Sequence, residues 1–191
     1  LNITKIVEVE VLNKNDVAMP KLSSKNDSTI ALKADGTVWA WGYNGNGQLG
    51  STNTDNKYKP TKINVENIID ISEGGNYTLL LSKDGKVYSF GSNNYNQLAR
   101  TENVLQVNEI DGLSNIIGIH ANTYNAMALD ANGNVYTWGY NGNGQLGTGN
   151  TATYSTPTRI ELNNVIKLAG NNQTSAAVDS NGKLYVWGYN G

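Results

Sequence analysis

The sequence predicts an all-β protein, a β-propeller built from about four repeats of roughly 49 residues. Ten residues, Trp41 to Gly50, return unchanged at 138–147, while a looser and a shortened copy occupy 90–99 and 187–191. The glycines that mark the four copies are 49, 48 and 49 residues apart: Gly42, Gly91, Gly139 and Gly188. No segment has the i, i+3, i+4 apolar spacing of a helix. A fixed period of this length in a chain of strand patterns is typical of a propeller.

The whole chain, 1–191, is expected to form one repeat domain or one incomplete ring. Residues 1–18 open with valines that alternate with other residues at 7, 9 and 11, which predicts a half-buried leading strand. The triplet Thr4-Lys5-Ile6 resembles 61–63 and 158–160, so this strand is expected at an outer edge, where it could complete the last blade. The repeats themselves are expected near 19–66, 67–114, 115–163 and 164–191, the last being incomplete.

Each repeat contains an Asp-Gly or Asn-Gly pair between two segments rich in β-branched and aromatic residues. Such a pair is a strong hairpin signal, and a type I′ turn requires positive φ at both central residues. Type I′ hairpins are therefore predicted at Asp35-Gly36, Asp84-Gly85, Asn132-Gly133 and Asn181-Gly182. Pro60 and Pro157 predict edge strands, because proline cannot donate to a sheet ladder. In the second repeat, Leu105, Val107 and Ile110 replace that strand.

The segment after each hairpin alternates an aliphatic or small residue with an aromatic one, at 38–41, 87–90, 135–138 and 184–187. Successive side chains of a strand point to opposite faces, so the aromatic residues share one face and the aliphatic residues share the other. Both faces are therefore expected to be buried between stacked sheets. The aromatic rings are expected to pack between neighbouring blades.

These motifs resemble the repeats of the regulator of chromosome condensation family, in a divergent, bacterial type. The resemblance extends from about Met19 to Gly191 and is most specific where tryptophan, the tight turn and Gly-Gln-Leu-Gly occur together, at 41–50 and 138–147. The sequence departs from the family's repeated histidine, whose positions hold Ser28, Tyr77, Asn125 and Thr174. The resemblance implies a propeller, usually of seven blades, that presents loops to a protein partner.

Nucleotide exchange on a small GTPase and chromatin binding are known in that family, but no exchange loop or basic arm is recognisable in this sequence. A bacterial β-lactamase inhibitor of similar architecture binds its target as a rigid protein ligand. Exchange factor and enzyme inhibitor therefore remain lesser alternatives for this chain.

Composition and motifs argue against an enzyme, a cofactor or a metal site. The net charge of −2 offers no basic field for nucleic acid, there is no cysteine, and no apolar run is long enough for membrane insertion. The Gly-x-Gly-x-x-Gly spacing at 45–50 and 142–147 lacks the following helix of a nucleotide site, so it predicts a loop that ties blades together. His120 is the single histidine, and Asp130 to Asn134 fits a hairpin turn better than a calcium loop.

The candidate binding residues are tyrosines and asparagines of the loops: Tyr43, Asn44, Tyr95, Tyr140, Asn141 and Tyr189. Tyrosine with Asn, Ser and Gly is typical of adaptable protein-binding loops. The alternative is that each tyrosine packs on the neighbouring blade while each asparagine caps its own turn. A residue that recurs in every repeat usually serves the repeat itself.

The sequence therefore predicts a non-enzymatic interaction scaffold, bacterial and secreted or on the cell surface, although a cytoplasmic location stays open. The expected partner is a protein, and a carbohydrate-binding module of a bacterial surface protein is the alternative. Four hairpins do not make the usual ring, and exposed sheet edges are normally covered. The 191 residues could be part of a longer propeller, pair with a second copy as an oligomer, or close on themselves through Thr4-Lys5-Ile6.

Overall fold

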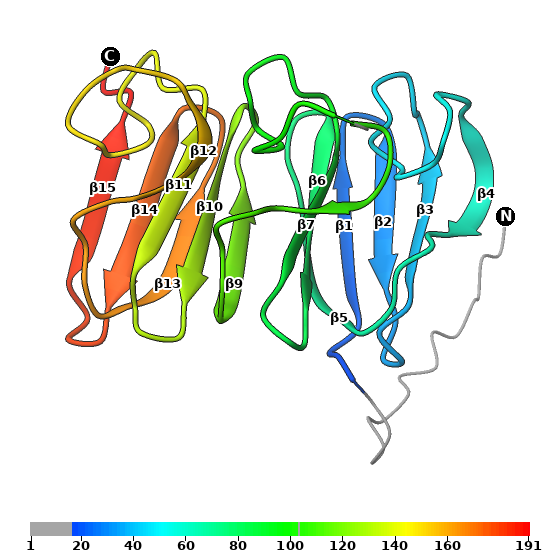
Figure 1. Cartoon of the computed structure of the whole chain (residues 1–191), viewed down its shortest axis with the longest axis horizontal. Coiled ribbons are helices and arrows are strands. Elements are labelled where there is room, and N and C mark those ends of the chain that lie inside the picture. The colour runs from blue at the N-terminus through cyan, green and yellow to red at the C-terminus, as the bar shows by residue number, and fades with distance from the viewer. Residues whose placement is uncertain (1–16, 103) are drawn as a thin grey trace, which may run out of the picture.

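The computed structural model describes residues 17–102 and 104–191, which form four antiparallel sheets. The four sheets follow one another along the long axis of the molecule (Figure 1). The described residues contain no helix, and hence none that could span a membrane. The all-β prediction is confirmed, and the sheets do not close into a barrel. Most of the leading strand predicted within 1–18 lies outside the described residues.

Each sheet is formed by strands that are consecutive in the sequence and paired with their neighbours. Sheet 1 comprises β1 (Lys21–Lys25), β2 (Ser28–Leu32), β3 (Val38–Gly42) and β4 (Lys57–Lys62). Sheet 2 comprises β5 (Ile68–Glu73), β6 (Tyr77–Ser82), β7 (Val87–Gly91) and β8 (Asn108–Glu109). Sheet 3 comprises β9 (Ile116–Ala121), β10 (Asn125–Asp130), β11 (Val135–Gly139) and β12 (Tyr154–Arg159). Sheet 4 comprises β13 (Val165–Gly170), β14 (Thr174–Asp179) and β15 (Leu184–Gly188).

The two edges of each sheet have different surroundings. The first strands β1, β5, β9 and β13 contact one another in sequence, so they form the inner side of the stack. Pro60 and Pro157 lie in β4 and β12 at the opposite edge, as predicted. In sheet 2 this edge is reduced to β8, a strand of two residues, where the sequence lacks the proline segment. Proline and a short strand both discourage further pairing at an exposed edge.

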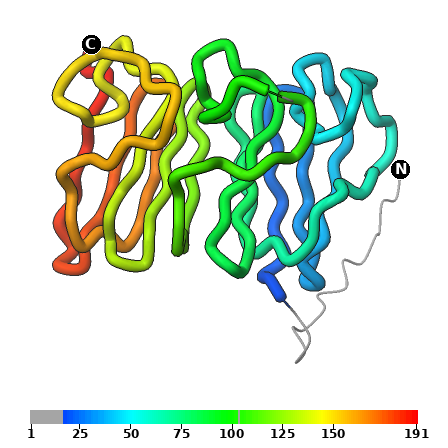
Figure 2. Tube along the Cα trace, viewed as in Figure 1, coloured from blue at the N-terminus to red at the C-terminus, as the bar shows by residue number. Residues whose placement is uncertain are grey.

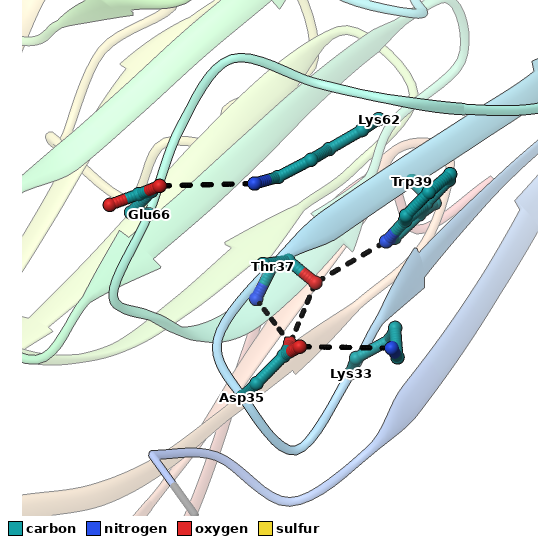
Figure 3. Close-up of polar contacts among 6 residues, drawn as sticks. All are labelled: Lys33, Asp35, Thr37, Trp39, Lys62 and Glu66. Carbon is teal, nitrogen blue, oxygen red and sulfur yellow. Dashed lines mark hydrogen bonds and ion pairs between the residues drawn. The ribbon is translucent and has the colours of Figure 1, made fainter.

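The hairpin positions were predicted correctly, but their turn type was not. In the first hairpin the Gly36 amide donates to the Lys33 carbonyl at 2.9 Å and Gly36 has φ of 78°, whereas Asp35 is not among the residues with positive φ. This is a three-residue loop with glycine in the left-handed region. The Asp35 carboxylate accepts hydrogen bonds from the Thr37 amide at 3.0 Å and from Thr37 Oγ1 at 2.6 Å (Figure 3). These bonds favour the longer loop.

A two-residue turn with positive φ at both positions does occur, but elsewhere. Asn26 and Asp27, with φ of 45° and 64°, connect β1 to β2. Asn and Asp tolerate this conformation better than other side chains. The pair lacks glycine, which is why the dipeptide pattern missed it.

Three apolar seams join the sheets, each formed by the second and third strands of one sheet and the first three strands of the next. Trp138 is fully buried between sheets 2 and 3, and its indole Nε1 donates to the Gln97 carbonyl at 2.9 Å. Trp187 donates in the same way to the Gln145 carbonyl at 2.9 Å. Phe90 is fully buried between sheets 1 and 2. The predicted packing of aromatic rings between blades is thus confirmed at this repeat position.

Burial of both faces holds for sheets 2 and 3 and is wrong for the two outermost sheets. In sheet 1 the face with the aromatic residues is open, since Leu22 is 73% exposed and Trp41 is only half-buried. The aliphatic face of the third strand is at most 1% exposed at Val38 and Ala40, but it is 63% and 61% exposed at Leu184 and Val186. The difference arises because no described residues lie against that face of sheet 4.

Candidate functional site

The longest loops gather at one end of the sheets, opposite the hairpin turns (Figure 2). The short connections between the first and second strands lie at the same end and form hydrogen bonds with these loops. For example, the Tyr43 amide donates to the Asp27 carbonyl at 2.8 Å, and the Tyr140 amide donates to the Tyr124 carbonyl at 3.0 Å. We call this end the loop face, formed by residues 26–27, 42–56, 74–76, 91–102, 104–107, 122–124, 139–153, 171–173 and 188–191.

The loop face is uncharged over much of its extent. Between sheets 2 and 4, the segments 74–76, 91–99, 122–124, 139–153, 171–173 and 188–191 contain no Asp, Glu, Lys, Arg or His. They consist mainly of Asn, Gly, Tyr and Thr. The turns at the other end do carry charges, as at 83–86 and 179–183. A partner that contacts these segments would therefore meet hydroxyl, amide and aromatic groups, while the charges of the loop face lie outside them, at Asp27, Asp55, Arg100 and Glu102.

Asn44 and Asn141 lie inside their loops and are fully buried. The Asn141 side-chain oxygen accepts from the Leu146 amide at 2.9 Å, and its amide group donates to the carbonyls of Asn150 and Ala152, both at 2.9 Å. Asn44 makes the matching bonds in its own loop. Both side chains thus cap their loops, which is the alternative role considered above, and neither reaches the surface where a partner would bind.

Replacing Asn141 with alanine should lower the free energy of unfolding by about 2–4 kcal/mol, because several backbone groups lose their partner at once. Urea denaturation followed by tryptophan fluorescence measures the change. Asn172, which is exposed on the same face, provides the control, and its alanine variant should change stability by less than about 0.5 kcal/mol. Equal effects for the two variants would contradict the assigned role.

The tyrosines of the predicted set are more accessible. Tyr43, Tyr95 and Tyr189 are 43%, 39% and 55% exposed, whereas Tyr140 is half-buried. The Tyr43 and Tyr140 rings fold over glycines of their own loops. A Cβ atom at Gly45 or Gly142 would lie 2.0 or 2.2 Å from the respective tyrosine hydroxyl, so a larger residue at either position would displace the ring above it.

Three tyrosines from two sheets meet on the loop face. The ring centre of Tyr95 lies 4.7 Å from that of Tyr124 and 5.3 Å from that of Tyr140, and the last two are 6.3 Å apart. These separations and tilted orientations are those of favourable aromatic pairs. Sequence analysis missed Tyr124, because its position in the short connection holds Asn76 and Gln173 in other repeats and no pattern marks it. Tyr43 and Tyr189 have no ring contact with this cluster among the described residues.

The glycine-rich loops connect the sheets through their glutamines. The Gln145 carbonyl accepts from Ser175 Oγ and Trp187 Nε1 of the next sheet, both at 2.9 Å. The Gln48 carbonyl accepts from Thr78 Oγ1 at 3.1 Å. No helix follows either copy of the Gly-x-Gly-x-x-Gly spacing. These loops are ties between blades, as the sequence predicted.

Two ionisable groups are enclosed where the first strands meet. Glu73 is 5% exposed, and its Oε1 atom accepts from Ser28 Oγ of sheet 1 at 3.1 Å. Burial raises the pKa of Glu73 to about 7, although hydrogen bonds from Ser23 and Ser28 and the charge of Lys25 oppose this. His120 Nε2 lies 3.1 Å from the Gly170 carbonyl, and burial lowers the pKa of this histidine. Within the described residues, no three His, Asp or Glu side chains could hold a metal ion together.

Sequence comparison agrees with this architecture. The family model described as the regulator of chromosome condensation (RCC1) repeat matches residues 35–81 and 132–178. A second model of the same repeat matches 21–48, 68–97 and 116–145. Together the two models cover well over half of the chain. The chain belongs to the RCC1 repeat family.

Known proteins with RCC1 repeats are related to this chain over most of its length. Human E3 ubiquitin-protein ligase HERC2 is 31% identical over 159 residues, which cover 80% of this chain and 3% of that protein. The mitochondrial RCC1 domain-containing protein RUG3 of Arabidopsis thaliana is 28% identical over 163 residues, covering 76% of this chain and 36% of RUG3. This RCC1-repeat chain thus spans less than two thirds of the curated relatives it matches.

Solved structures show the same fold. Prp20p of Saccharomyces cerevisiae superposes with a TM-score of 0.79 at 24% identity, over 88% of this chain and 43% of Prp20p. In a complex with Kap60 the yeast protein gives a TM-score of 0.77 at 22% identity, over 95% and 45% of the two chains. The likeness establishes the RCC1-type propeller fold for the four sheets.

Proposed function

We propose that this RCC1-repeat chain is a non-enzymatic scaffold that binds a protein partner through the loop face of sheets 2 to 4. The observation that carries the proposal is the cluster of Tyr95, Tyr124 and Tyr140 on an uncharged surface. Tyrosine offers a large contact area at a low cost in conformational entropy, while Asn, Ser and Gly supply adaptable hydrogen bonds. The rigid sheets beneath hold this cluster in place, which favours binding by preorganisation.

The relatives support a binding role without identifying the partner. The yeast protein Prp20p is described by its binding to Gsp1p and histones, and it has also been solved with Kap60 bound. The uncharged segments around the tyrosine cluster suit a partner surface with few charged groups. Binding should therefore change little over a roughly tenfold range of salt concentration, since screening acts on charges.

The test is capture of a partner by the immobilised chain from native lysate or culture medium. The double variant Tyr95→Ser/Tyr124→Ser should reduce capture at least about tenfold, because aromatic residues at the centre of an interface typically contribute 2 kcal/mol or more. Tyr58, 95% exposed on β4, provides the control, and Tyr58→Ser should capture as the unmodified chain does. Undiminished capture by a folded double variant would contradict the proposed site.

A neutral carbohydrate is the second candidate ligand, favoured by the same tyrosine cluster and by the amide-rich loops around it. Tyrosine rings stack on the C–H face of a sugar, and amides bond to its hydroxyls. A glycan array that contains neutral and acidic oligosaccharides should show neutral binding that is lost in the Tyr95→Ser/Tyr124→Ser variant. An array without signal would remove this candidate and leave the protein-binding proposal intact.

A further inference from the structure

The tyrosine cluster contains two residues that the repeat itself does not require. Tyr95 takes the place of Asn46 and Asn143, since the backbone amide of each donates to the side-chain oxygen of the glutamine two positions later, at 2.8–3.0 Å. Tyr124 takes the place of Gln173, and the carbonyls of both accept from the amide that begins the adjoining tie loop, at 3.0 Å. Both departures from the repeat therefore fall on residues that contact each other.

These two positions form a tie between the loops of neighbouring sheets. Between sheets 3 and 4, the Asn143 side-chain amide donates to Gln173 Oε1 at 3.1 Å. Between sheets 2 and 3, the same positions hold Tyr95 and Tyr124, whose ring centres are 4.7 Å apart. Rings at this separation are in direct contact. The tie between sheets 2 and 3 therefore consists of two phenols.

The geometry of this pair suits oxidative coupling of the two rings. Phenols couple through the ring carbons next to the hydroxyl, and the resulting biphenyl has ring centres only slightly closer than 4.7 Å. Its rings are twisted, neither coplanar nor perpendicular, and the planes of Tyr95 and Tyr124 meet at 53°. The two pairs that involve Tyr140 are longer, at 5.3 and 6.3 Å, and steeper, at 66° and 83°. Tyr95 is 39% exposed, so a dissolved oxidant has access to one ring of the pair.

No other tyrosines are arranged for coupling in this way. Outside the cluster, no tyrosine ring contacts another tyrosine ring in the part of the chain that the structure describes. The chain also has no cysteine whose thiol would be oxidised first. Groups held side by side in one chain meet at an effective concentration on the order of millimolar or more. At micromolar protein concentration, coupling within the chain is therefore favoured over coupling between chains.

We infer that Tyr95 and Tyr124 are an oxidative cross-linking site, at which a haem peroxidase with hydrogen peroxide forms dityrosine. Each phenol loses one electron and one proton, and the two radicals join through a C–C bond between their Cε carbons. The hydrogen on each joined carbon then moves to the oxygen of its ring as a proton, which restores both hydroxyls. Altogether two electrons and two protons leave the chain and reduce one hydrogen peroxide to two water molecules. The new bond fixes the loops of sheets 2 and 3 to each other.

The test uses the purified chain at about 1 µM, treated with a haem peroxidase and hydrogen peroxide in the absence of a partner. We expect a single-chain product that has lost two hydrogens, shows the blue fluorescence of dityrosine and yields, after digestion, one joined peptide pair containing residues 95 and 124. Tyr95→Phe and Tyr124→Phe keep a ring of similar size but lack the phenol, so each should abolish this product. Tyr58→Phe, changed at a side chain that is 95% exposed, is the control and should retain it.

The cross-linked chain should also unfold at a higher urea concentration than the untreated chain, because a covalent loop from 95 to 124 restricts the unfolded state. A parallel reaction with free tyrosine confirms that the oxidant is active. With an active oxidant, three results would overturn the inference: no single-chain product, a product that persists in Tyr124→Phe, or a bridge from Tyr95 to Tyr140. None of them bears on the proposed function, which capture of a partner by the untreated chain tests separately.

Discussion

Replacing Trp138 with alanine is expected to lower the free energy of unfolding by about 3–5 kcal/mol, the usual range for deleting a large buried aromatic side chain. Trp138 is fully buried between sheets 2 and 3, so its loss opens a cavity in the seam. It also removes the hydrogen bond from Nε1 to the Gln97 carbonyl. We expect the midpoint of urea denaturation, followed by circular dichroism, to fall accordingly.

The Trp138→Phe variant separates packing from hydrogen bonding. Phe90 occupies the same position in sheet 2, so the repeat accepts phenylalanine there. This variant should lose about 1–3 kcal/mol, the cost of a smaller ring and an unpaired carbonyl. A Tyr58→Ala control, altered at a side chain that is 95% exposed, should change stability by less than about 0.5 kcal/mol. A Trp138→Ala variant as stable as this control would show that the seams do not hold the sheets together.

Replacing Glu73 with glutamine is expected to stabilise the protein above neutral pH. Burial raises the pKa of Glu73 from 4.5 to about 7 in the folded chain. The folded state therefore binds the proton more tightly than the unfolded state, and stability falls as the pH rises from about 4.5 to about 7. The full loss is on the order of 3 kcal/mol. Glutamine keeps an acceptor for Ser28 but carries no charge, so its variant should not show this loss.

The measurement is the free energy of unfolding of both proteins between pH 4 and pH 9, at constant ionic strength. The difference should be small below about pH 4.5 and approach 3 kcal/mol in favour of Glu73→Gln at pH 8. Glu66, paired at 3.8 Å with Lys62 on the surface, provides the control, since exposed ion pairs contribute about 0–1 kcal/mol (Figure 3). Parallel pH profiles for the unmodified chain and Glu73→Gln would refute the role assigned to this carboxylate.

Sequence reasoning succeeded where the repeat itself supplied the information. Several patterns recur with one period, so each is supported by more than one copy in the sequence. They are the hairpin positions, the edge strands with Pro60 and Pro157, and the tie loops at 45–50 and 142–147. The burial of Trp138 followed from strand alternation alone, because the ring shares a face with the other aromatic residue of its strand.

The features that could not be predicted depend on contacts between particular side chains, which the repeat pattern does not specify. The hairpin at Asp35-Gly36 has a loop of three residues and not two, because the Asp35 carboxylate accepts hydrogen bonds from the amide and hydroxyl groups of Thr37. Tyr124 occurs in one repeat, so its place in the tyrosine cluster has no periodic signal. The exposure of Leu184 follows from the absence of described residues against its face. The burial of Glu73 follows from the close approach of β1 and β5.

The most direct test of the stacked-sheet account is a nuclear Overhauser measurement on the indole N–H proton of Trp138. In the structure this proton points to the Gln97 carbonyl of the preceding sheet, at a donor-to-acceptor distance of 2.9 Å. The account predicts cross-peaks from the indole proton to the backbone protons of Gln97 and Leu98, together with slow exchange with solvent. An indole proton that exchanges rapidly and shows no cross-peak to either residue would contradict it.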